Sequence, residues 1–290
     1  MDSKNINLDD MNTFQILERI NEEDKKVAYA VEKELNSITA AVDIIVEAFR
    51  KGGRLFYIGS GTSGKLGVID ASECPPTFGV EDEMVQGIIS GGKEAIGGWL
   101  EHTEDDMELA IEDIKERNIN SKDILVGITA SGNTPYVVSA IEYGKSLGCR
   151  TIGLICRKEG KLKNLCDTII AVEVGDEVIS GSTRMKAGTA QKLVLNMLST
   201  ASMIKLGNTY GSLMVGVRPI NLKLQKRVEE IVQSATGADS DYIKEVLSKC
   251  EHNAKTAIVT IKGNVSIAEA KLALEKGKGR IAEALRTLEK

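Results

Sequence analysis

The fold of this chain is decided by the stretch Leu55-Phe-Tyr-Ile-Gly-Ser-Gly-Thr-Ser-Gly-Lys-Leu-Gly-Val-Ile-Asp-Ala-Ser-Glu-Cys-Pro-Pro-Thr-Phe-Gly79. Its apolar start, Leu55–Ile58, predicts a buried strand, and the loop Gly59–Gly64 leads directly into a helical segment. A glycine- and hydroxyl-rich turn between a strand and a helix aims free backbone N–H groups at one place, where the helix dipole also favours negative charge. The stretch therefore predicts an anion site, most simply for a phosphate, at the end of a strand.

Further apolar runs alternate with helical patterns along the chain. The predicted strands are 85–89, 124–128, 151–155 and 168–174. The predicted helices between them are 93–115, 135–147 and 158–166. Strands rich in Val, Ile and Leu that alternate with helices are typical of a parallel sheet covered on both faces. We therefore predict an α/β fold with three αβα layers around a central parallel sheet.

Helical sequence also flanks the predicted sheet. Residues 13–50 read as helices, with Asn21 ahead of three acids as a helix start. A long helix is expected over 183–206, and the glycine-rich residues 207–220 read as a linker. The helical sequence beyond is too short for a second large core. We predict an N-terminal helical segment 1–50, a central domain 51–218 and a small C-terminal helical domain 219–290.

The composition excludes several classes of function. The 290 residues carry a formal net charge of -5 and only 4% aromatic residues, which argues against nucleic acid as a partner. Only two histidines are present, so a histidine metal site or a Ser-His-Asp triad has almost no material. Five scattered cysteines form no CxxC pair, which indicates neither a disulfide framework nor a zinc site.

The same features bear on where the protein works. Unpaired cysteines are typical of a reducing cytoplasm. The polar residues Met1–Asn5 lack the apolar core of a signal peptide, and no apolar run approaches the length of a membrane span. We therefore expect a cytoplasmic protein without a membrane partner.

Three hydroxyl-rich loops follow predicted strands. Because ligands of parallel sheets bind beyond the carboxyl ends of the strands, we expect these loops to share one site. Each loop alone has an ordinary alternative: a tight turn, a helix cap or a solvated charged turn. Together they predict a pocket for a small phosphorylated, polyhydroxyl ligand. The candidate binding residues are Ser60, Thr62 and Ser63 in the first loop, Ser131, Asn133 and Thr134 in the second, and Ser182, Thr183 and Lys186 in the third.

Two carboxylates are candidates for chemistry at this pocket. Glu73 stands just before Pro75-Pro76, and Glu104 lies in the acidic run 101–106. Two carboxylates whose pKa values differ can serve as general acid and general base. The alternative for the run 101–106 is a solvated helix face. For Glu73 the alternative is a C-terminal helix residue held by the prolines, although an acid is unfavourable at that end of a helix.

Three segments also carry a family resemblance. Gly59–Gly79, Ala130–Tyr136 and Ser182–Lys192 are similar to the signature motifs of the N-acetylmuramic acid 6-phosphate etherases. These enzymes form a family within the sugar isomerase (SIS) domain superfamily. The resemblance extends over nearly the whole chain, and it implies an SIS-type central domain.

The resemblance implies a carbon–oxygen lyase that acts in cell-wall amino sugar recycling. Such an enzyme cleaves the D-lactyl ether of N-acetylmuramic acid 6-phosphate by elimination and water addition, giving N-acetylglucosamine 6-phosphate and D-lactate. The family's catalytic carboxylates match Glu73 and Glu104. It works without a metal or organic cofactor, usually as a homodimer with active sites at the subunit interface.

Two other functions fit the same superfamily. An aldose–ketose isomerase of sugar phosphates would also remove a C2 proton, and it would release no lactate. A non-catalytic sugar-phosphate sensor, like the glucokinase regulatory proteins, would need the loops but not the acids. The presence of both Glu73 and Glu104 favours the etherase.

Overall fold

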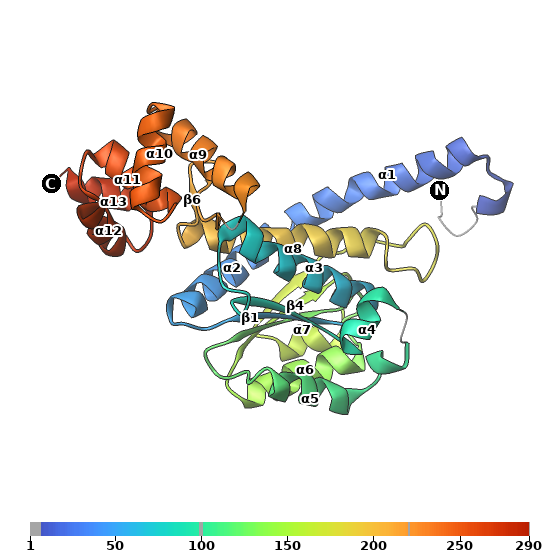
Figure 1. Cartoon of the computed structure of the whole chain (residues 1–290). Helices are drawn as coiled ribbons and strands as arrows, with labels where there is room; N and C mark the ends of the chain where they lie inside the picture. The colour runs from blue at the N-terminus through green and yellow to red at the C-terminus, as the bar shows by residue number, and fades with distance from the viewer. Residues whose placement is uncertain (1–6, 99–100, 220, 290) are drawn as a thin grey trace.

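The computed structural model describes residues 7–98, 101–219 and 221–289. Its centre is a five-stranded sheet in the order β2-β1-β3-β4-β5, and every neighbouring pair is parallel (Figure 1). The strands are β1 (Leu55–Gly59), β2 (Val85–Ile89), β3 (Ile124–Ile128), β4 (Arg150–Ile155) and β5 (Thr168–Ala171). The predicted parallel sheet is confirmed.

Helices cover both faces of this sheet. One layer holds α1 (Thr13–Glu32), α2 (Leu35–Arg50), α3 (Gly61–Phe78) and α8 (Lys186–Lys205). The other holds α5 (Met107–Glu116), α6 (Pro135–Ser146) and α7 (Lys161–Leu165). Strand side chains alternate between the two layers: Leu55 and Tyr57 pack with the first, Phe56 and Ile58 with the second. The predicted three-layer αβα fold is confirmed.

The remaining helices lie C-terminal to this core. A short hairpin of β6 (Thr209–Tyr210) and β7 (Leu213–Met214) precedes them. They gather around a hydrophobic cluster of their own, at one side of the molecule in Figure 1. The elements are α9 (Leu222–Thr236), α10 (Ser240–Lys249), α11 (Ala254–Gly263), α12 (Ile267–Lys276) and α13 (Ile281–Leu288). In the described parts of the chain, no helix combines the length and the apolar character needed to cross a bilayer.

Two helix predictions are wrong. Asn21 lies inside α1, which begins at Thr13 because Asn12 and Gln15 form a capping box there. The single helix predicted over 93–115 is instead α4 (Gly92–Gly97), the 3-10 turn η3 (Glu101–Glu104) and α5. Asp106 caps α5 through its carboxylate and starts a new helix. Residues 99 and 100, like the polar stretch 1–5, lie outside the described residues.

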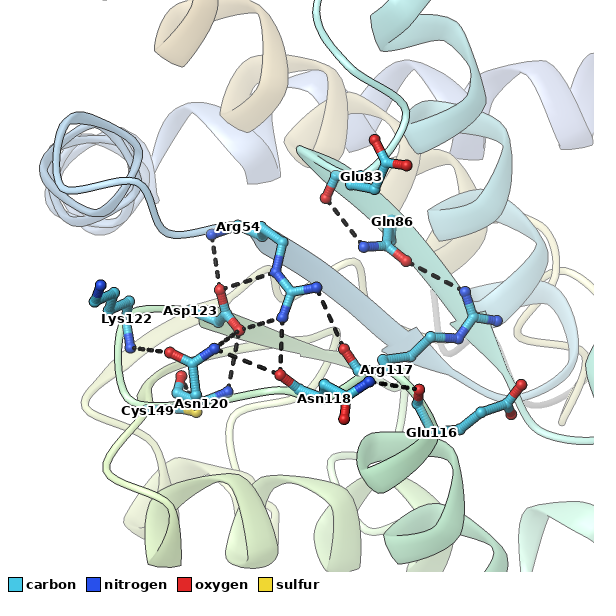
Figure 2. A network of polar contacts seen from close by, with 10 residues as sticks. All are labelled: Arg54, Glu83, Gln86, Glu116, Arg117, Asn118, Asn120, Lys122, Asp123 and Cys149. Atoms are coloured by element: carbon cyan, nitrogen blue, oxygen red, sulfur yellow. Dashed lines mark hydrogen bonds and ion pairs between the residues drawn. The ribbon is translucent and has the colours of Figure 1, made fainter.

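A polar network closes the edge of the sheet where β1 and β3 begin (Figure 2). Asp123, almost fully buried, accepts from the backbone N–H of Arg54 at 2.9 Å and pairs with its guanidinium at 2.7 Å. The guanidinium also donates to the carbonyls of Arg117 and Asn118, and the backbone N–H of Asn120 donates to Asp123. This network holds β1 and β3 in register at their N-terminal ends. The hydroxyl-rich loops lie at the opposite, C-terminal ends of the strands.

The backbone at the end of α3 is in direct contact with the backbone of the linker, residues 207–220. Gly79, the C-cap of α3, has φ +67°, and a Cβ built there would lie 1.6 Å from the carbonyl oxygen of Gly216. No side chain fits between these backbones, so the linker is fixed directly against α3.

This contact can be tested against a matched glycine. Gly52→Ala should cost about 1–2 kcal/mol, the ordinary penalty of the left-handed backbone, because Gly52 has φ +77° and open space around it. Gly79→Ala should cost at least about 2 kcal/mol more, because the linker must also move. Chemical denaturation of both variants measures the difference. Equal losses in the two variants would contradict the close approach.

Candidate active site

The ends of β2, β1 and β3 form the candidate site. The chain leaves β1 toward β2 and then crosses to β3 on the other side, so the order reverses between β1 and β3. Ligands of open parallel sheets bind at such a reversal, outside the carboxyl ends of the strands. The first two predicted loops, 60–63 and 130–134, lie directly at this point.

The loop after β3 forms a cluster of hydroxyls at the N-terminus of α6. Thr129 Oγ1 lies 2.7 Å from Thr134 Oγ1 and 3.2 Å from Ser131 Oγ, which also accepts from the backbone N–H of Asn133. Pro135 occupies the first turn of the helix. Free amides and hydroxyls at a helix N-terminus suit a phosphate. Sequence reasoning did not select Thr129, which directly precedes the loop 130–134.

The loop after β1 leaves two buried polar groups for a ligand. Ser63 Oγ donates to Gln191 Oε1 of α8 at 2.9 Å, which joins the first turns of α3 and α8. Within the described residues, the buried Ser60 Oγ and Gln191 Nε2 have no hydrogen-bond partner. Buried polar atoms without partners are costly, so a sugar hydroxyl or phosphate oxygen here would be stabilising. Thr62 is exposed at the same turn.

Lys186, predicted in the third loop, pairs with a buried acid. The N-terminus of α8 is already capped, because Glu177 accepts from the backbone N–H groups of Lys186 and Ala187 at 2.9 and 3.0 Å. The Lys186 side chain is 2% exposed, and its ammonium lies 2.7 Å from Glu23 of α1. In this structure Lys186 neutralises Glu23, and its role in binding stays a prediction.

A strand-end cavity of about 860 Å³ extends from the second loop to the third. Of the predicted binding residues, it brings together Ser131, Asn133 and Thr183. Arg157 and Lys158, which follow β4, supply cations at its wall. The predicted residues that do not line it are Ser60, Thr62, Ser63, Thr134, Ser182, Lys186, Glu73 and Glu104.

Glu104 stands at the strand-end edge of the sheet. It is the exposed last residue of η3. The neighbouring Thr103 donates to Ser90, 3.2 Å away, directly after β2, and Ser90 in turn donates its backbone N–H to Gly59 of β1. η3 also packs against α6. The turn η3, which carries Glu104, therefore lies at the strand-end edge of the sheet.

Glu73 lies far from that edge. α3 begins at Gly61. The alternative for Glu73 was a helix that ends at the prolines, but α3 continues through Pro75 and Pro76 to Phe78. Twelve residues of helix separate Gly61 from Glu73, which corresponds to about 18 Å along the axis. Glu73 is exposed on the helix surface. The chain therefore holds the turn that carries Glu104 at the strand-end edge, but Glu73 more than three helical turns from the start of α3.

A buried acid fixes the orientation of α3. Asp70, one turn before Glu73, accepts from Ser199 Oγ at 3.2 Å and from Asn196 Nδ2 at 3.3 Å, both on α8. Burial raises the pKa of Asp70, and the hydrogen bond from Ser199 opposes it. This role could not be predicted from local sequence, because Asp70 and its partners on α8 are far apart in the chain.

The fold and the hydroxyl-lined strand ends define an SIS domain. Residues 104–201 match the family model described as SIS domain, and residues 37–145 match that of the glucokinase regulatory protein N-terminal SIS domain. The phosphoheptose isomerase structure from Neisseria gonorrhoeae is similar in fold, with a TM-score of 0.50 and 17% identity over 66% of this chain and 99% of that one.

Full-length relatives narrow the assignment. The N-acetylmuramic acid 6-phosphate etherase of Clostridium beijerinckii is 50% identical, over 98% of this chain and 93% of its own length. That of Clostridioides difficile strain 630 is 48% identical, over 98% of this chain and 94% of its own. The chain belongs to the N-acetylmuramic acid 6-phosphate etherase family, which confirms the resemblance seen in its motifs.

The buried pair of Glu23 and Lys186 gives a stability prediction. Glu23→Gln leaves a buried ammonium unpaired and should cost about 3–5 kcal/mol, most of which Lys186→Met in the same chain should restore. The exposed pair Glu22–Lys25 provides the control, and Glu22→Gln should change the free energy of unfolding little. Urea denaturation of Glu23→Gln, of Lys186→Met alone, of the double variant and of Glu22→Gln measures these changes. An additive double variant would contradict the pairing.

The same pair predicts a pH dependence. Burial acts to raise the pKa of Glu23, but Lys186 and Lys26 outweigh it and lower the pKa from 4.5 to about 2. A lowered carboxyl pKa stabilises the folded state above the unfolded value. The difference in stability between the wild type and Glu23→Gln should therefore be full above pH 4.5 and shrink as the pH falls toward 2.

Proposed function

We propose that this protein cleaves the D-lactyl ether of N-acetylmuramic acid 6-phosphate, releasing D-lactate and N-acetylglucosamine 6-phosphate. Membership of the etherase family carries the proposal. The hydroxyl cluster of Thr129, Ser131 and Thr134 at the N-terminus of α6 suits the phosphate. The reaction belongs to the recycling of cell-wall amino sugars, and we place it in the cytoplasm, where the unpaired cysteines would stay reduced.

The chemistry is an elimination followed by addition of water. In the open-chain sugar the C1 aldehyde acidifies the proton on C2, and the lactyl oxygen on C3 lies β to that carbonyl. A base removes the C2 proton while an acid protonates the departing lactyl oxygen, and water then adds at C3. Two carboxylates suffice for these steps. We assign Glu73 as the acid toward the lactyl oxygen and Glu104 as its partner for the C2 proton or the water.

Each active site would then combine two protomers. Glu104 lies beside the phosphate loops, whereas Glu73 lies about 18 Å along α3 from them, farther than a hexose phosphate extends. Glu73 cannot reach the loops of its own protomer. In the proposed homodimer, Glu73 of the partner subunit reaches them instead. We therefore propose a homodimer with its active sites at the interface.

Exposed apolar side chains mark a surface for such a dimer. Phe14 and Tyr29 of α1 are 71% and 69% exposed, and Ile69 of α3 is 58% exposed. α1 extends alongside α8 well past the sheet (Figure 1). Large apolar residues exposed in this way are typical of interfaces.

One observation favours a second function. Residues 37–145 match the model of the glucokinase regulatory protein N-terminal SIS domain. A sensor of sugar phosphates would bind the substrate or product at the same loops without turnover. An aldose–ketose isomerase would turn over a sugar phosphate without lactate. Release of D-lactate from N-acetylmuramic acid 6-phosphate identifies the etherase. If no lactate appears, formation of a ketose phosphate indicates the isomerase, and binding of the sugar phosphate without turnover indicates the sensor.

Substitution of either acid should abolish most of the activity. Glu73→Gln and Glu104→Gln should each lower kcat for D-lactate release by about a hundred- to ten-thousand-fold, the usual contribution of an acid or base. Glu94→Gln, an exposed acid on α4, should remain near wild type. Near wild-type turnover of Glu73→Gln would remove Glu73 from the mechanism.

Isotopes distinguish the elimination from direct displacement at C3. In deuterated water the product should carry deuterium at C2, and in heavy-oxygen water it should carry the label at the C3 hydroxyl. Mass spectrometry and proton NMR of N-acetylglucosamine 6-phosphate measure both. A product that carries the heavy oxygen at C3 but no deuterium at C2 would indicate direct displacement and contradict the elimination, as would a product that keeps its original C3 oxygen.

A further inference from the structure

A second cavity, here called the junction cavity, lies between the end of α3, the linker and the turn that joins α10 to α11. Its volume is about 290 Å³, enough for a small molecule. Its polar side chains come from Asn208, Arg218, His252 and Lys255, among others. None of the predicted site residues lines it.

Lys255 places an ammonium group at this cavity, and the hydrogen-bonding capacity of that group is only partly used. The half-buried ammonium donates to Asn208 Oδ1 at 2.9 Å, and no carboxylate of the described residues lies within ion-pair distance of it. Burial lowers the pKa of Lys255, so its charged form is held at a cost. An ammonium has three N–H donors, and a ligand oxyanion would supply the missing acceptor and charge.

His252 adds a second unsatisfied group. Its Nδ1 is buried without a hydrogen-bond partner among the described residues. Both Glu251 and His252 have φ +56°, a left-handed conformation that is uncommon for residues other than glycine. The strained turn fixes the position of the imidazole beside the N-terminus of α11. A protonated Nδ1 would donate to an anion oxygen.

Arg218 adds a second cation to the cavity, which the carboxylate-bearing Glu251 also lines. Its Nε donates to the carbonyl oxygen of Gly79 at 2.9 Å, and one terminal nitrogen pairs with Glu81. The guanidinium has further N–H donors beyond these two contacts. Arg218 therefore anchors the cavity to the C-cap of α3.

We propose that the junction cavity binds a small oxyanion, a carboxylate or a phosphate group, through Lys255, His252 and Arg218. Its lining shares no residue with the strand-end loops of the same chain, and the proposal does not depend on the proposed reaction. A bound anion would bridge α11 to the end of α3, the helix that carries Glu73. The two products of the proposed reaction carry one group each, a carboxylate on D-lactate and a phosphate on the sugar.

The two histidines of the chain make a direct test possible. His252 lies at the junction cavity, and His102 lies on η3 beside Glu104. Imidazole nitrogen–proton NMR of the full-length protein follows both rings while inorganic phosphate or D-lactate is added separately. Saturable shifts of the His252 signals are expected with at least one anion. Shifts with phosphate alone, D-lactate alone or both identify the preferred group.

Variants separate binding from a general effect of salt. Lys255→Gln should weaken the anion's effect on His252 at least about tenfold, as expected for the loss of a charged hydrogen bond. Lys244→Gln, on the exposed surface of α10, should leave it unchanged. If Lys255→Gln does not fold, Arg218→Gln serves the same purpose. His252 signals that neither anion moves, or equal titrations in the Lys255 and Lys244 variants, would overturn the proposal.

Discussion

The close packing of α3 against the first two strands is the constraint on which the site depends. A Cβ at Gly87 of β2 would lie 2.5 Å from the Cα of Val68, so a larger residue would push the helix away. On its other side, α3 is joined to α8 by Asp70, whose carboxylate accepts from Ser199 and Asn196. Because both sides are held, α3 carries its first-turn hydroxyls and Glu73 at a fixed separation.

The distance between the first turn of α3 and Glu73 links the proposed reaction to dimer formation. The end of the same helix also contacts the linker to the C-terminal helices. The first turn of α3 lies at the strand-end loops, whereas Glu73 lies about 18 Å farther along the helix. The helix then ends at Gly79, against the backbone of the linker and the junction cavity. One helix thus connects the ligand-binding edge, the proposed catalytic acid Glu73 and the linker to the C-terminal core.

The sequence predicted the features that depend on local signals. The β-strands, the helix start at Pro135 and the hydroxyl-rich loops follow from apolar runs and turn residues, and the structure contains them. The distant pairings were not predictable. Lys186 looked free beside hydroxyls, but its partner Glu23 is 163 residues away. Likewise, the motif around Glu73 gave no distance to the loops, because α3 continues through two prolines that normally end a helix.

We propose that the two catalytic carboxylates of one active site, Glu73 and Glu104, come from different protomers. The most direct test mixes two inactive variants, Glu73→Gln and Glu104→Gln, after dissociation and lets them reassociate. A mixed dimer then contains one site with both native acids. Random pairing predicts recovery of about a quarter of wild-type D-lactate release. If exchange of subunits is verified and no activity returns, both acids act within one protomer and the account is contradicted.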